Sequence, residues 1–93
     1  MGCATHHHTV EQDEVTMYLS VGNARSVKFA YSLDQFRLRK TDRVDAGTWK
    51  IRVTANHCFT YFYVIDGDVY IPDCRLKESD DFGSENCLYV PGM

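Results

Sequence analysis

The sequence predicts an all-β fold, a sandwich of six to eight short strands. Three observations lead to this prediction. Apolar and polar side chains alternate with a period of two in several segments, as in half-buried strands. Asp66-Gly67 separates two apolar runs and is a strong signal for a tight hairpin. No stretch has the apolar spacing of a helix of useful length.

Length and charge limit the function classes. The 93 residues make one domain with a single small core. The net charge is −3, and the basic residues gather only at Arg37, Arg39, Lys40 and Arg43. We read that cluster as a solvated loop, and an acidic domain lacks the basic surface that nucleic-acid binding needs. No apolar run is long enough for a membrane-spanning helix.

Residues 1–14 are expected to form a flexible tail, because they lack hydrophobic periodicity. The folded domain is expected at residues 15–91. His6, His7 and His8 could bind a metal ion, but in a mobile tail such histidines are usually adventitious, and no metal site is predicted.

Residues 2–5 indicate where in the cell the protein is found. Gly2-Cys3-Ala4-Thr5 resembles the beginning of a mature bacterial lipoprotein, in which Cys3 would carry the lipid. This favours the bacterial cell envelope, with a lipid anchor as the contact with the membrane. The alternative is a cytoplasmic protein with an ordinary cysteine at this position.

Four segments precede the predicted hairpin. Residues 15–20 and 27–31 alternate as strands, residues 32–47 are polar and irregular, and residues 48–53 form a further amphipathic strand. In the hairpin strand 59–65, both faces are apolar. One face carries Phe59, Tyr61, Tyr63 and Ile65, and the other carries Thr60, Phe62 and Val64. A sandwich strand needs only one apolar face, so the second must meet a loop, a partner or a ligand.

The four cysteines, at positions 3, 58, 74 and 87, form no C-x-x-C pair, which argues against structural zinc. Cys74 and Cys87 are the best candidates for a disulfide, because both border the loop that leads into the last strand, residues 87–90. Three free thiols in the folded part are the alternative. No cofactor is expected.

Several runs resemble the early-set glycogen-binding domain, the module at the front of isoamylases and branching enzymes and in the β subunit of AMP-activated kinase. The runs are GTWKIRV, YFYVIDG, YIPD and DDFGSENCLYV, within residues 14–91. The resemblance implies an immunoglobulin-like sandwich. It also implies that Trp49, the only tryptophan, is buried in the core.

The resemblance further implies a sugar-binding face. Phe36 takes the place of the first sugar-stacking tryptophan of this family, and Phe62 takes the place of a lysine. The second tryptophan corresponds to Tyr70 when counted back from Pro72, or to Val69 when counted forward from Gly67. Tyr70 is preferred, with one inserted residue. A polar pair matches Glu85 and Asn86.

No catalytic constellation can be placed on the chain, so an enzyme is not expected. The resemblance implies a non-catalytic module that binds an α-glucan weakly. The loss of both tryptophans and of the lysine supports a second hypothesis: the sandwich has become a module for protein interaction or self-association.

Overall fold

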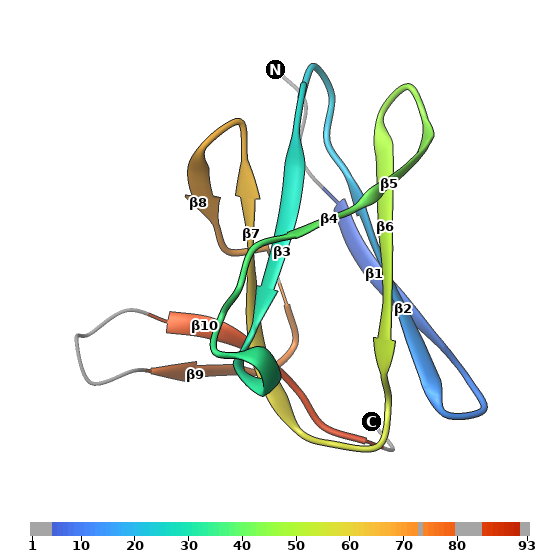
Figure 1. Ribbon diagram of the computed structural model, residues 1–93, viewed down its shortest axis with the longest axis vertical. Helices are drawn as coiled ribbons and strands as arrows, with labels where there is room; N and C mark the ends of the chain where they lie inside the picture. The colour runs from blue at the N-terminus through green and yellow to red at the C-terminus, as the bar shows by residue number, and fades with distance from the viewer. Residues whose placement is uncertain (1–4, 73, 80–84, 92–93) are drawn as a thin grey trace.

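The computed structural model describes residues 5–72, 74–79 and 85–91, and its strands form two antiparallel sheets that face each other (Figure 1). The all-β, immunoglobulin-like sandwich predicted from the sequence is confirmed. The described residues contain ten strands, more than the six to eight expected, because several are only two or three residues long.

The first sheet has the order β1-β2-β6-β5. Its strands are β1 (Thr5–Glu11), β2 (Glu14–Ser20), β6 (Thr48–Thr54) and β5 (Asp42–Asp45). β2 and β6 pair along their whole lengths, from Glu14 opposite Thr54 to Ser20 opposite Thr48. The predicted alternation holds, since Val15, Met17 and Leu19 are all buried.

The second sheet has the order β4-β3-β7-β10-β9, with β8 paired to β7. Its strands are β3 (Val27–Tyr31), β4 (Arg39–Lys40), β7 (Phe59–Ile65), β8 (Asp68–Tyr70), β9 (Lys77–Ser79) and β10 (Glu85–Tyr89). β8 and β10 share one edge of β7, because β8 pairs with residues 63–65 and β10 with residues 59–61. β4 and β5 lie in the segment expected to be irregular, and the chain changes sheet between them at Thr41.

The predicted hairpin at Asp66-Gly67 is present between β7 and β8. Both turn residues have positive φ, 50° and 89°, as a two-residue turn of this kind requires. The Asp66 carboxylate accepts hydrogen bonds from the backbone N–H groups of Arg25 and Ser26, at 2.9 and 2.8 Å. These bonds fix the tip of the hairpin to the loop between the two sheets.

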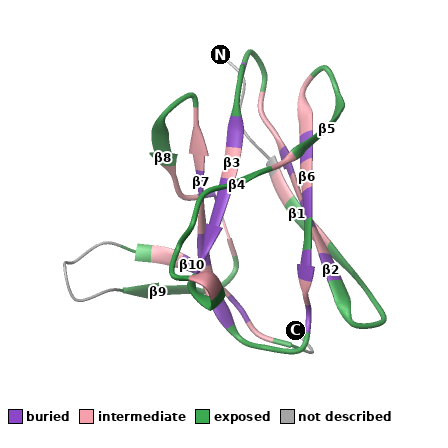
Figure 2. Ribbon diagram, in the orientation of Figure 1, coloured by how far each residue is buried: buried purple, intermediate pink, exposed green. Residues whose placement is uncertain are grey.

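The core lies between the sheets, where buried segments of β2, β3, β6 and β7 face one another (Figure 2). It is unusually aromatic. Its large members from the second sheet are Phe29, Tyr31, Phe59, Tyr61, Tyr63 and Tyr89. Trp49, expected in the core from the family resemblance, is buried on β6 with 7% of its surface exposed.

The expected flexible tail is wrong for residues 5–14, because residues 5–11 form β1. β1 pairs with β2 in full register, from Thr5 opposite Ser20 to Glu11 opposite Glu14. A two-residue turn at Gln12-Asp13 joins the two strands, and Gln12 has a φ of 56°. The physical reason is that His6 and His8 face the core side and pack on tyrosine rings, which a count of apolar residues does not register.

Cys74 and Cys87 form a disulfide, which joins the chain after β8 to β10. Cys58 is a free, exposed thiol in the turn before β7. Cys3 lies outside the described residues. Among the residues that are described, the structure has no helix with the length and apolar character to cross a membrane.

Candidate functional site on the outer face of the second sheet

The outer face of the second sheet is the surface turned away from the core. β7 alternates across it as the sequence predicted, with Phe59, Tyr61 and Tyr63 buried inside and Phe62 and Val64 only half-buried outside. Ala30 lies opposite Phe62 in the pairing of β3 with β7. Ala30 is fully buried although it points outward, so this part of the face is covered.

Two of the predicted site residues meet on this face. The rings of Phe36 and Phe62 are stacked, with centroids 5.7 Å apart and planes inclined by 17°. This is an offset arrangement of the kind that aromatic pairs prefer. Phe36 is the outer ring and is 38% exposed. The pair therefore presents a flat apolar surface to solvent.

The loop after β3 positions Phe36. A single 3-10 turn, η1 (Ser32–Asp34), follows the strand, and the Ser32 hydroxyl accepts a hydrogen bond from the Thr60 N–H of β7 at 3.1 Å. Gln35 and Phe36 then both have positive φ, 64° and 60°. Two consecutive left-handed residues reverse the chain, and the Phe36 N–H donates to the Tyr31 carbonyl at 3.0 Å. The reversal places the Phe36 ring over β7.

Asp34 holds the end of this loop in place. Its carboxylate accepts hydrogen bonds from the Arg37 N–H, at 3.2 Å, and from the Arg39 side chain, with which it forms an ion pair. The Arg39 guanidinium also lies 5.3 Å from the centre of the Tyr31 ring. The hydrogen bond to Asp34 raises the pKa of Arg39. The basic cluster seen in the sequence thus has a local structural role at Arg39.

The prediction that Tyr70, rather than Val69, belongs to the sugar-binding face is wrong, because Tyr70 points to the core. Tyr70 pairs with Tyr63, a core residue, and opposed residues point to the same side of a sheet. Tyr70 accordingly packs against the core. Val69 pairs with Val64, faces outward, and is 66% exposed. The outward position of β8, opposite Val64, is therefore occupied by an aliphatic side chain.

The polar pair before the last strand is divided between the two faces. Asn86 alternates with buried Cys87, so it points outward, on the same side as Phe62. Glu85 lies two residues before Cys87 and so lies on the same side of the strand as Cys87. It is exposed at the start of β10, opposite Ser79. The structure thus brings Phe36, Phe62 and Asn86 to one face and leaves Tyr70 and Glu85 off it.

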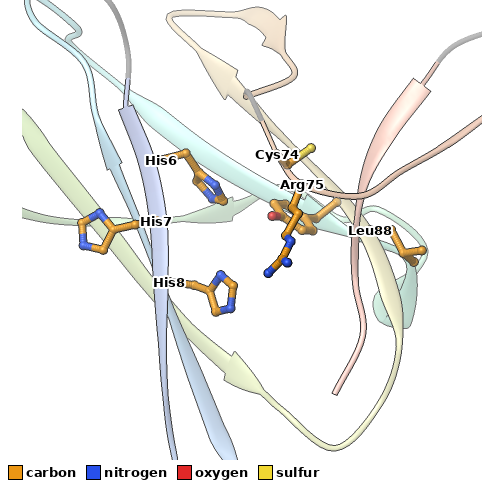
Figure 3. A pocket seen from close by; sticks show the side chains of 7 residues that line it. His6, His7, His8, Cys74, Arg75 and Leu88 are labelled. Carbon is orange, nitrogen blue, oxygen red and sulfur yellow. The ribbon is translucent and has the colours of Figure 1, made fainter. Parts of the chain in front are cut away.

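A second concave region lies at the edge of the sandwich, between β1 and the chain after β8 (Figure 3). It is a cavity of about 290 Å³. Its lining residues are His6, His7, His8, Tyr61, Cys74, Arg75 and Leu88. Figure 3 shows His6 and His8 projecting from β1 toward Arg75, whereas His7 projects to the opposite side of the strand, where it stacks on Tyr18.

Burial lowers the pKa values of two histidines in this cavity. The His6 Nε2 atom is 3.0 Å from the Tyr63 hydroxyl, and burial lowers the pKa of His6 from 6.5 to about 4. The pKa of His8 is also lowered, first by burial and then by the charge of His7. Burial raises the pKa of Tyr61, so its hydroxyl stays protonated. Sequence reasoning missed this cavity, because three consecutive histidines give no alternation of apolar and polar side chains.

Comparison with known proteins supports the fold. No family model and no curated protein matches the chain. Among solved structures, it is similar to a pullulanase from Bacillus acidopullulyticus, with a TM-score of 0.60 and 14% sequence identity. The match covers 89% of this chain and 11% of the pullulanase chain, so the protein spans about a tenth of that enzyme's length. The fold and the outer face thus define an immunoglobulin-like β-sandwich similar to one part of a pullulanase.

Proposed function

We propose that the protein is a non-catalytic module that binds an α-glucan through the Phe36–Phe62 pair. The stacked pair is the observation that carries this proposal. Flat aromatic rings bind the apolar faces of glucose units, and polar neighbours such as Asn86 can bond the hydroxyl groups. The structural similarity to part of a pullulanase, an enzyme named for its action on an α-glucan, supports the same substrate class. So does the resemblance of the sequence to glycogen-binding domains.

The arrangement of Phe36 and Phe62 indicates how tightly a glucan would bind. Only Phe36 offers an exposed ring, because Phe62 lies partly beneath it. Val69 adds apolar contact but no ring. One stacking ring with few polar partners is expected to give a dissociation constant of about a millimolar. A repeated contact along a polysaccharide would raise the apparent affinity through multivalency.

Affinity electrophoresis in gels containing glycogen tests the proposal. The wild-type protein is expected to be retarded, and Phe36→Ala is expected to weaken binding about five-fold, since one ring–sugar contact contributes roughly 1 kcal/mol. Phe36→Trp is expected to strengthen binding, because a larger ring covers more of the sugar. Val44→Ala, which removes an exposed apolar side chain from the other sheet, is the matched control.

The proposal fails if the wild-type protein migrates equally with and without glycogen, at concentrations that retard a known glucan-binding domain. It also fails if Phe36→Ala and Val44→Ala reduce retardation to the same extent.

Self-association through the outer face is the second candidate function. The observation that favours it is the exposure of Val69, 66%, beside half-buried Val64 and Phe62. A dimer would cover these aliphatic side chains. Sedimentation velocity over a wide range of concentrations distinguishes the two, because a strict monomer that binds glycogen leaves only the first.

For location, we retain the proposal of a lipid anchor at Cys3 on the bacterial cell envelope, with the cytoplasm as the alternative. The motif around Cys3 is its only support. Expression of the complete gene with labelled palmitate tests it. Label that is retained by the wild type and lost in Cys3→Ser is the expected result, and an unlabelled wild-type protein would favour the cytoplasm.

A further inference from the structure

The histidine cavity is a second concave region, separate from the outer face. It is formed by four parts of the chain: β1, β7, the connection between β8 and β9, and β10, which contributes Leu88. The disulfide anchors this connection to β10 immediately before Arg75. The side chains of His6, His8 and Arg75 converge on the space between them (Figure 3). The walls on two sides therefore belong to fixed elements of the sandwich.

Every polar side chain in the described lining of the cavity can donate a hydrogen bond. Among the residues that the structure describes, the lining contains no carboxylate. Arg75 brings a guanidinium with five N–H groups and has no ion-pair partner within residues 5–72, 74–79 and 85–91. The Tyr61 hydroxyl is protonated because burial raises its pKa. Each histidine ring offers at least one N–H group, and both rings become donors on every nitrogen when protonated.

We propose that this cavity binds a phosphate or sulfate group, either as the free anion or as an ester of a small molecule. The planar fork of an arginine matches two oxygens of such a group. His8 and the Tyr61 hydroxyl can donate to the remaining oxygens. The volume of about 290 Å³ lies just below the range for ligand pockets, roughly 300–1,000 Å³, so the cavity has room for the anion or a small ester of it.

A metal ion is the competing ligand for adjacent histidines, and the surroundings argue against it. Within the described part of the chain, no group of three or more His, Cys, Asp or Glu residues is placed to hold a metal. The His6 Nε2 atom is already engaged by the Tyr63 hydroxyl. The positive charge of Arg75 in the same cavity would repel a cation and attract an anion.

Sulfate is the first probe, because it keeps both charges between pH 5 and pH 8. Calorimetric titration of the full chain at pH 6.0 is expected to show saturable binding at one site. Arg75→Ala is expected to weaken binding at least ten-fold, and Arg75→Lys is expected to restore part of it. Arg25→Ala, at an exposed turn outside the cavity, is the matched control and is expected to leave binding unchanged.

The imidazole signals give a readout that a purely structural effect would not move. The groups facing His6 are Tyr61 and Tyr63 of β7 and His8. His8 faces Tyr89 of β10 and Arg75 of the connection after β8, and His7 is its neighbour on the same strand. A bound anion favours the charged imidazole, so saturating sulfate is expected to raise the pKa of His8. By linkage, sulfate then binds more tightly at pH 5.5 than at pH 8.

The source of the anion is distinguished by comparing sulfate with glucose 6-phosphate and with glucose. Tighter binding of glucose 6-phosphate than of sulfate assigns the site to an ester, and equal binding assigns it to the free anion. Absence of sulfate binding, an unchanged His8 pKa, or equal affinity of the wild type and Arg75→Ala would overturn the proposal. Loss of glycogen binding in Phe36→Ala has no bearing on these results, so the two sites are tested separately.

Discussion

The docking of β1 predicts a pH-dependent stability, to which His6 is expected to make the largest contribution. The pKa of His6 is lowered from 6.5 to about 4 in the folded protein, chiefly because burial disfavours its charged form. The unfolded chain, with an ordinary histidine pKa, then binds the proton more tightly than the folded chain does. Stability contributed by neutral His6 is therefore complete above pH 6.5 and is lost progressively as the pH falls toward 4.

The size of the effect follows from the two pKa values. At pH 5.0, an unfolded histidine is almost fully protonated, whereas buried His6 is mostly neutral. The linkage relation gives a loss of about 2 kcal/mol between pH 7.5 and pH 5.0. The complete loss, reached below pH 4, would be about 3 kcal/mol. For a domain of this size, 2 kcal/mol corresponds to a fall in Tm of roughly 8–16 °C.

Urea denaturation at pH 7.5 and at pH 5.0 measures this loss, in buffers free of phosphate and sulfate. His6→Gln removes the titrating group, so the variant is expected to lose about 2 kcal/mol less than the wild type between the two pH values. His57→Gln, at an exposed turn, is the matched control and should behave as the wild type does. If the wild type and His6→Gln lose equal stability, His6 is not buried against β7 and this account of β1 is wrong.

Two further predictions concern the disulfide and the orientation of β8. Replacing Cys74 and Cys87 by alanine is expected to lower the free energy of unfolding by about 2–4 kcal/mol, the usual effect of a cross-link with a separation of 13 residues, and an unchanged urea midpoint would contradict it. Val69→Lys is expected to change stability by less than about 0.5 kcal/mol, whereas Tyr70→Lys should cost about 2 kcal/mol or more, because only Tyr70 packs on the core. Equal costs for the two lysine variants would show that the register of β7 and β8 is different.

The faces of the central strands could be predicted because burial there follows a simple alternation. In β2, β6 and β7 every second residue is apolar and buried, so the period of two determined which residues form the core. The second apolar face of β7 correctly indicated that something covers it. That cover is the Phe36 loop, whose path depends on two left-handed residues, Gln35 and Phe36, for which the sequence has no glycine signal.

The errors have specific causes. β1 was missed because histidine is polar by composition, yet His6 and His8 pack on tyrosine rings in the structure. Tyr70 was misplaced because an inserted residue was assumed after Gly67, whereas the two-residue turn leads directly to Val69 on the outer face. The cavity at Arg75 depends on contacts between segments distant in sequence, which no local pattern contains.

Chemical-shift mapping with maltoheptaose tests the central claim, that the outer face around Phe36 binds an α-glucan. In ¹H–¹⁵N spectra, the expected result is a set of saturable shifts at Phe36, Phe62 and Asn86, with no change at the inward-facing Tyr70. Shifts absent at high sugar concentration, or confined to residues outside this face, would contradict it.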